Sequence, residues 1–256
     1  MPNPIAHPAA SIPFTRAGLV FSALVIGSLS PDFGYFVEMP TPYFEYTVPG
    51  LILFDVPVGF VLLWLFHALM KWPLLSALPE SLQRRLVKHA QGFSFGPLKR
   101  FGLIILSLLV GSLTHVICDS FTHDYGWMVQ QLAVLRMPVG GTPLYAILQD
   151  LGTIVGIGLL AYWFLRWLPT AAQSDQLPAR FSGKVRTIFF VLAAISLAAV
   201  EGAIIYRRVI TGSRFVHGYF LLGSTTFSAA FIISFFVGVY CLAWMVTFHK
   251  TIRRAG

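Results

Sequence analysis

Long apolar segments alternate with short polar connections along this 256-residue chain. A helix needs about 20 consecutive apolar residues to cross a bilayer, and several of these segments approach that length. The pattern therefore predicts an all-α protein, a polytopic membrane helical bundle that forms a single integral-membrane domain over residues 1–256. We expect about six transmembrane spans, at residues 17–30, 50–70, 101–118, 149–168, 186–206 and 219–247.

Composition agrees with the membrane prediction, because 56% of the residues are hydrophobic and only 11% are charged. The net charge of +8 comes from Lys and Arg in the short connections, where residues that orient membrane helices are found. The basic charge thus implies contact with membrane lipids and no nucleic-acid partner. Cys118 and Cys241 lie in separate apolar segments without metal-binding spacing, so we expect free thiols.

The distribution of basic residues predicts how the spans are oriented. The connection at about 71–100 is the most basic, which predicts that it is cytoplasmic. Residues 31–49 contain Asp32, Glu38 and Glu45 but no Lys or Arg, as expected for an external connection. Both termini are then predicted to be cytoplasmic. Three basic residues are placed on the external side, against the rule that basic connections are cytoplasmic: Arg207, Arg208 and Arg214. The first connections and the basic carboxyl-terminal tail agree with the rule, so we keep this orientation.

The phrase THVICDSFTH, at the end of the third span, contains His115, Asp119 and His123. Steps of four residues drift only about 40° around a helix, so these side chains share one face if the helix continues past Asp119. Imidazole and carboxylate together suit zinc or a similar divalent ion. The alternative is that Asp119 caps the helix and the histidines lie in the hydrated membrane interface.

Two residues distant in sequence are candidates for the same site. Under the predicted topology Asp32, at the outer end of the first span, reaches the same side of the membrane as His115. His7 precedes Pro13, which disfavours a straight helix from His7 to Ser30. A segment that turns near Arg16 would bring His7 back toward Asp32. Without that turn His7 stays on the cytoplasmic side and cannot join.

Small residues indicate where helices can approach closely. Ser107 and Gly111 recur with His115 at every fourth position, which favours a buried histidine with a second helix packed beside it. Gly152 and Gly156 form a GxxxG pattern in the fourth span. These small-residue faces suit packing between helices of one chain as well as packing between copies of the chain in a homo-oligomer.

Two acidic residues lie inside predicted spans and raise a different hypothesis. Asp55 and Glu201 either pair with neighbouring helices or line a pathway for a small-molecule or ion transporter. The small-residue faces alone would suffice for a third hypothesis, a non-catalytic membrane scaffold. Nucleotide-binding, zincin and serine-hydrolase motifs are absent from the sequence.

Four phrases in order resemble a known family of bacterial membrane proteins. They are HPAA, LVIGSLSPDFGYF, VPGLILFDVPVGFVLLWLFH, and THVICDSFTH followed by Gly126 and Trp127. Together they look like the uncharacterised family DUF4184, over about the whole chain. Sparse His and Asp positions are similar to the membrane-bound metal-dependent hydrolases of the YdjM type and, more remotely, to the helical zinc-dependent phospholipases C.

This resemblance implies a metal site and a hydrolase in the bacterial cytoplasmic (inner) membrane. The substrate we expect is a lipid or lipid-linked phosphoester at the external face, since the site lies at headgroup depth. Tyr46 stands where those relatives often have a histidine, which favours a single ion, or a vestigial site, over a two-metal centre. The resemblance implies a divalent metal, most readily zinc, with Asp119 and Asp32 as catalytic carboxylates. The implied metal ligands are His7, Asp32, His115, Asp119 and His123.

Overall fold

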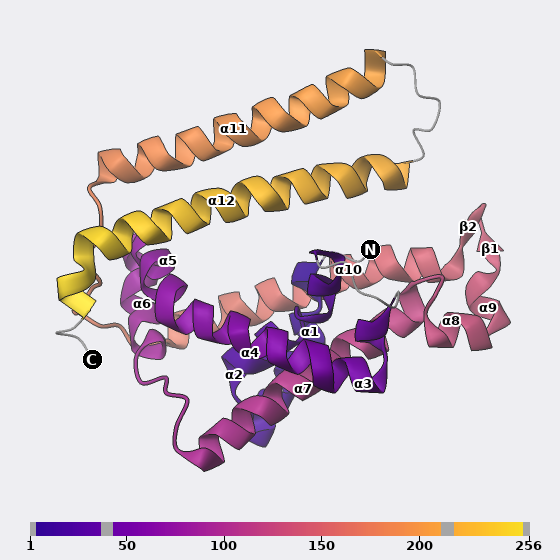
Figure 1. Cartoon of the computed structure of the whole chain (residues 1–256), viewed down its shortest axis with the longest axis horizontal. Coiled ribbons are helices and arrows are strands. Elements are labelled where there is room, and N and C mark those ends of the chain that lie inside the picture. Colours follow the sequence, from indigo (N-terminus) through magenta and orange to yellow (C-terminus); the bar gives the residue numbers. More distant parts are fainter. Residues whose placement is uncertain (1–3, 37–42, 211–217, 253–256) are drawn as a thin grey trace. The chain divides into compact units, whose positions relative to one another are not determined.

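The structure is a computed structural model of the chain, and it describes residues 4–36, 43–210 and 218–252 (Figure 1). The all-α prediction is confirmed. Within the described ranges, strands are limited to β1 (Pro138–Val139) and β2 (Thr142–Pro143), which pair antiparallel with Pro138 opposite Pro143. Three features used above to predict orientation lie outside the described residues: Glu38, Arg214 and the basic tail from residue 253.

Most of the described residues lie in helices. Shorter 3-10 helices span Pro4–Ala6, Ile12–Ala17, Pro31–Phe36, Phe44–Tyr46 and Leu168–Thr170, and π-helical turns span Leu51–Asp55 and Phe66–Met70. The α-helices are α1 (Pro8–Ser11), α2 (Phe21–Gly27), α3 (Val48–Gly50), α4 (Val56–Leu65), α5 (Lys71–Ala77), α6 (Glu80–Ala90), α7 (Leu98–Thr122), α8 (Trp127–Gln131), α9 (Ala133–Arg136), α10 (Leu144–Trp167), α11 (Gly183–Ile210) and α12 (Gly218–Ile252).

Four helical segments of the described chain are long and apolar enough to cross a membrane. They are Val48–Ala77, Leu98–Gln131, Leu144–Thr170 and Gly183–Ile204, and they coincide with the second to fifth predicted spans. A shorter apolar helical stretch, Ile232–Phe248, lies within the sixth. The polytopic membrane class predicted from the apolar segments therefore stands.

The first predicted span differs from the other five. Residues 17–30 contain only α2, whose seven residues cover about 10 Å, a third of the hydrocarbon core. The chain turns at Gly18, whose φ of 81° is a left-handed conformation that favours glycine. This turn lies two residues after Arg16, where a turn was required to bring His7 back toward Asp32. Residues 4–30 therefore form a hairpin rather than one straight helix.

The described residues divide into two compact units, each discontinuous in sequence. The first contains residues up to Phe66 together with Phe93–Ala171, and the second contains His67–Gly92 with the residues from Ala172 on. Four residues form the buried apolar core of the first unit: Ala23, Leu63, Ile104 and Leu108. The expectation of one integral-membrane domain stays a prediction.

The second unit is held by polar contacts around α6. Gln83 is fully buried and donates from Nε2 to the carbonyls of Ser76 and Leu78, at 3.0 and 2.7 Å. Glu80 pairs with Arg84 and Arg180 on the surface. The helix ends at Ala90, before Gly92 with its φ of 73°. This helix lies within the basic connection at about 71–100.

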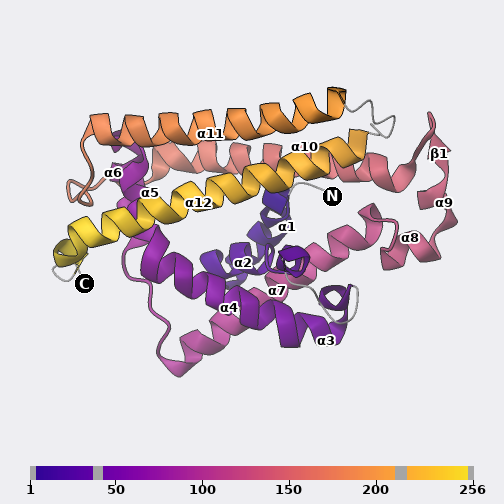
Figure 2. The ribbon, with the colours of Figure 1, turned by 45° about the horizontal axis from the view of Figure 1, so that its top comes forward.

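Close packing of α2 against α7 positions the candidate site (Figure 2). A Cβ on Gly27 would lie 2.3 Å from the carbonyl oxygen of Leu108, and one on Gly111 would lie 2.3 Å from that of Leu24. Only glycine allows the two backbones to approach this closely. Ser107 contributes as well, because its Oγ accepts a 2.9 Å hydrogen bond from the Val20 amide. The small residues of α7 are thus used to pack α2.

Candidate metal centre

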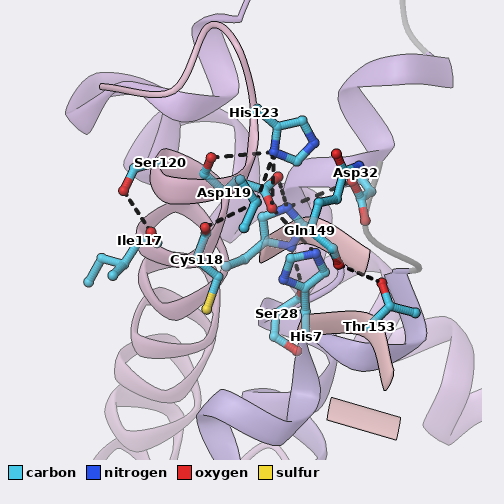
Figure 3. Close-up of polar contacts among 12 residues, drawn as sticks. His7, Ser28, Asp32, Ile117, Cys118, Asp119, Ser120, His123, Gln149 and Thr153 are labelled. Carbon is cyan, nitrogen blue, oxygen red and sulfur yellow. Dashed lines mark hydrogen bonds and ion pairs between the residues drawn. The ribbon is translucent and has the colours of Figure 1, made fainter. Parts of the chain in front are cut away.

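The five predicted ligands converge at the carboxyl end of α7. His115 and Asp119 project from α7, His123 caps it, Asp32 comes from the 3-10 helix Pro31–Phe36, and His7 precedes α1. Figure 3 shows His7, Asp32 and His123 around Asp119. The helix continues through Thr122, so the shared face expected from the four-residue spacing is present.

His115 is the most completely positioned of the five side chains. It has no exposed surface, and its Nδ1 lies 2.8 Å from the carbonyl oxygen of Ser28. A carbonyl only accepts hydrogen bonds, so Nδ1 must carry the proton. In a neutral ring Nε2 then presents a lone pair, and it faces Asp119 Oδ2 at 3.1 Å and Asp32 Oδ1 at 3.7 Å.

Three acceptors facing one another are stable only with a cation between them or a second proton on His115. Histidine ligands in metal sites commonly donate the other ring N–H to a backbone carbonyl, as His115 does to Ser28. The contact with Ser28 thus fixes Nδ1 as the donor and leaves Nε2 as the ring nitrogen that would bind a metal.

The carboxylate of Asp119 divides its two oxygens between different partners. Oδ2 accepts a 3.2 Å hydrogen bond from the Tyr46 hydroxyl in addition to its contact with His115. Oδ1 lies 3.5 Å from both His7 Nε2 and His123 Nδ1, and it has no hydrogen-bond partner within the described part of the chain. Asp119 is therefore at the centre of the cluster, with one oxygen held and one available.

His7 reaches the cluster because the amino-terminal segment packs tightly on α10. A Cβ on Gly156 would lie 2.9 Å from the Cβ of Ala6, so the small residue permits this approach. The His7 ring stacks on His115 with centroids 3.8 Å apart and is 6% exposed. Burial, followed by the proximity of His115, lowers the pKa of His7 to about 3. The neutral imidazole is the form that binds metals.

Asp32 supplies the second carboxylate beside His115, with its Oδ1 3.7 Å from Nε2. Burial raises its pKa to about 6, and the positive charge available on His115 opposes that shift. Its Oδ2 is buried without a hydrogen-bond partner among residues 4–36, 43–210 and 218–252. An unpartnered buried carboxylate oxygen is costly unless a cation or proton is supplied. The chemistry of Asp32 thus fits a metal ligand.

His123 lies at the edge of the cluster. Its backbone leaves helical geometry, and its Nδ1 is 3.3 Å from the Asp119 carbonyl and 3.2 Å from the Thr122 hydroxyl. Its Nε2 is buried, with no hydrogen-bond partner in the described ranges. Whether His123 binds a metal directly stays a prediction.

Three side chains offer ligand atoms close enough to share one ion. One atom each from His7, Asp32 and His115 lies within 4.8 Å of the others. Two nitrogens and one carboxylate oxygen match the donor set of catalytic zinc sites, which use three protein ligands and leave one position open. The residues present therefore fit a single divalent ion.

Other polar residues near this site were not predicted as part of it. The Ser28 carbonyl carries no sequence signal, because backbone atoms are common to every residue. Tyr46 was noted only as a departure from the family pattern, although a tyrosine can reach a carboxylate through its hydroxyl. Glu45 is 4% exposed and has one carboxylate oxygen, Oε2, without a hydrogen-bond partner in the part of the chain that the structure describes.

The two acids of the transport hypothesis fall in different units. Asp55 lies in the first unit, within the π-helical turn Leu51–Asp55, and Glu201 lies in α11 of the second. Asp55 has no exposed surface, and neither of its carboxylate oxygens has a hydrogen-bond partner among the described residues. Turns of this type occur often at functional sites, so Asp55 is a second candidate residue of the first unit.

Comparison with known proteins identifies a family but no activity. The model of a family described as a domain of unknown function, DUF4184, matches residues 1–247. No curated protein and no solved structure matches the chain.

Proposed function

Since the chain belongs to the DUF4184 family, a domain of unknown function, we propose its function from the cluster itself: it is a membrane-embedded, metal-dependent hydrolase. The observation that carries the proposal is the position of His115 Nε2, which lies 3.1 Å from a carboxylate oxygen of Asp119 and 3.7 Å from one of Asp32. A divalent cation would bind between these three atoms, and two histidines with a carboxylate favour zinc.

In this proposal His7, Asp32 and His115 hold the ion. A divalent ion in such a site lowers the pKa of water and polarises a phosphoryl oxygen. Asp119 Oδ1 is the nearby acceptor without a hydrogen-bond partner in the described chain, so it takes the proton of the attacking water as general base. Tyr46 holds Asp119 in place through Oδ2.

The proposed substrate is a lipid or lipid-linked phosphoester. The cluster lies at the carboxyl end of α7, a helix long enough to span the hydrocarbon core, and hence near the depth of phosphate headgroups. Water would attack phosphorus as its proton passes to Asp119, the ester P–O bond would break, and Asp119 would return that proton to the oxygen of the departing alcohol. In this proposal the basic connection at about 71–100 is cytoplasmic, so this end of α7 lies at the external face of a bacterial cytoplasmic membrane.

Elemental analysis of the detergent-purified protein tests the proposal, after any metal-binding affinity tag has been removed. We expect close to one equivalent of zinc in the wild type and in His89→Ala, a matched control at an exposed position of α6. His115→Ala should lose the metal, whereas Asp119→Ala, which removes the proposed general base, should lose hydrolysis. No bound metal in the wild type, including after dialysis against zinc, would overturn the metallohydrolase proposal.

Ion or small-molecule transport is a second candidate, because Asp55 is a fully buried acid within a candidate span and lacks a hydrogen-bond partner among the described residues. The substitution Glu201→Gln separates the two functions. Loss of a transport activity with metal binding intact would replace the hydrolase proposal by transport. Hydrolysis that is unchanged in Glu201→Gln would leave the hydrolase proposal in place.

A further inference from the structure

The connection between α7 and α10 exposes an unusual number of large apolar side chains. We call residues 127–139, which contain α8, α9 and β1, the apolar connection (Figure 1). Soluble loops of this length seldom expose so many apolar residues together. The exposed fractions are 66% for Trp127, 44% for Leu132, 53% for Val134, 58% for Met137 and 54% for Val139.

This exposure does not reflect a loosely packed loop, because the opposite side of the apolar connection is buried. Val129 has no exposed surface and Leu135 is 6% exposed. Helix α8 packs on α7, and α9 packs on α10. Gly126 lets the chain fold back over the end of α7, since a Cβ there would lie 2.5 Å from the Ser120 carbonyl oxygen. The exposed apolar residues thus form a fixed outer surface.

The lengths of the flanking helices place this surface near the membrane boundary. Helices α7 and α10 contain 25 and 24 residues. At 1.5 Å per residue they are about 37 and 36 Å long, which exceeds the roughly 30 Å of hydrocarbon. Their outer surfaces are also apolar, with Ile117 50% and Leu151 50% exposed close to the connection. The apolar connection continues this lipid-facing surface to the level of the headgroups.

We propose that the apolar connection inserts into the headgroup and acyl boundary of the bilayer. Trp127 and Arg136 suit this depth, because an indole prefers the interface and a guanidinium can reach phosphate groups. A protein partner explains the pattern less well, because the surface is continuous with two helices that already face lipid.

A consequence rests on the proposed function. The cluster ends at His123, only four residues before Trp127, so insertion of the connection holds the cluster beside the phosphoester of a bilayer lipid. The substrate would then be a lipid within the membrane rather than a phosphoester dissolved in water.

Spin labels measure the depth of the apolar connection directly. Single cysteines replace Val134 and Val139 in a Cys118→Ser, Cys241→Ser background, and the protein is reconstituted in phosphatidylglycerol–phosphatidylethanolamine vesicles. Ile154→Cys, 69% exposed within α10, is the bilayer reference, and Asp175→Cys, whose native side chain is fully exposed, is the aqueous reference. We expect greater accessibility to oxygen than to a water-soluble nickel chelate at positions 134 and 139, as at 154.

Two results would overturn the insertion proposal. One is an accessibility at positions 134 and 139 that equals the aqueous reference at 175. The other is exclusion of both reagents together with spin–spin broadening, which would assign the surface to a second copy of the chain.

The depth measurement needs neither metal nor substrate, so its failure is distinguishable from failure of the hydrolase proposal. In the double variant Val134→Asp, Val139→Asp we expect metal content to stay unchanged and KM for a vesicle-embedded phosphoester to rise about tenfold, equivalent to about 1.4 kcal/mol. An unchanged KM would contradict the consequence for the substrate. If the labels lie at membrane depth but the wild-type protein has no hydrolase activity, the insertion proposal stands and the hydrolase proposal fails.

Discussion

At the scale of single residues, His115 connects the backbone of α2 to the carboxylates of the cluster. Its Nδ1 donates to the Ser28 carbonyl, so the position of Nε2 depends on where α2 ends. A lysine or glutamine in its place could not combine a fixed donor with a metal-binding lone pair on one rigid ring. This is the physical reason for burying a histidine here.

Zinc should raise the melting temperature of the wild-type protein. A ligand present at 100 times its Kd stabilises the folded state by about 2.7 kcal/mol, which corresponds to roughly 5–10 °C for a chain of this size. The shift should disappear in His115→Ala and after addition of a chelator. Scanning fluorimetry in detergent measures it, with His89→Ala as control. An equal zinc shift in His115→Ala would place the metal elsewhere.

Asp55 offers a test of the cost of an unpartnered buried carboxyl. Because neither oxygen has a hydrogen-bond partner in the described chain, Asp55→Asn should stabilise the metal-free protein by about 1 kcal/mol. Asp150→Asn, an exposed position of α10, should change nothing. Thermal unfolding in detergent compares the two. A lower melting temperature in Asp55→Asn would show that the carboxyl contributes to the fold.

At the scale of elements, the close approach of α2 and α7 makes the site possible. We expect Gly111→Ala to cost about 1–3 kcal/mol, because its Cβ would meet backbone atoms that cannot rotate away. Displacement of α2 should also move the Ser28 carbonyl from His115 and weaken zinc binding. Gly102→Ala lies on the same helix with nothing within 4 Å, and should be neutral or gain about 0.5–1 kcal/mol.

Thermal unfolding and zinc titration together distinguish a packing effect from an effect on the site. If Gly111→Ala binds zinc as tightly as Gly102→Ala, the contact between Ser28 and His115 does not govern metal affinity.

The elements show which parts of the site sequence patterns can predict. His115 and Asp119 follow from helical spacing, since a long α7 fixes their relative positions. Asp32 follows from counting crossings. His7 does not, because its position depends on the left-handed turn at Gly18 and on the packing of Ala6 against Gly156. Contacts between segments distant in sequence leave no periodic pattern along the chain.

At the scale of the whole chain, the same turn changes the basis of the topology prediction. Counting residues 17–30 as a crossing placed the amino terminus in the cytoplasm. In the structure His7 lies beside Asp119, near the carboxyl end of α7. The Val20 amide donates to Ser107, about three turns nearer the amino end, and Asp32 again lies near the carboxyl end, beside His115. The hairpin thus begins and ends at the same end of α7, whereas Lys99 lies at the other end.

We therefore expect an amino-terminal epitope on the same side of the membrane as Gly140, in the exposed turn between β1 and β2, and opposite to Lys99. Impermeant maleimide labelling of Gly140→Cys and Lys99→Cys in intact cells, in a Cys118→Ser, Cys241→Ser background, assigns the two ends of α7. Antibody access to the epitope shows on which side of the membrane the amino terminus lies.

Detection of the epitope only after permeabilisation, with Gly140→Cys labelled in intact cells, would restore the cytoplasmic amino terminus. Residues 17–30 would then have to cross the membrane. Detection together with Gly140→Cys would establish a re-entrant hairpin, which delivers His7 to the cluster from the outer face.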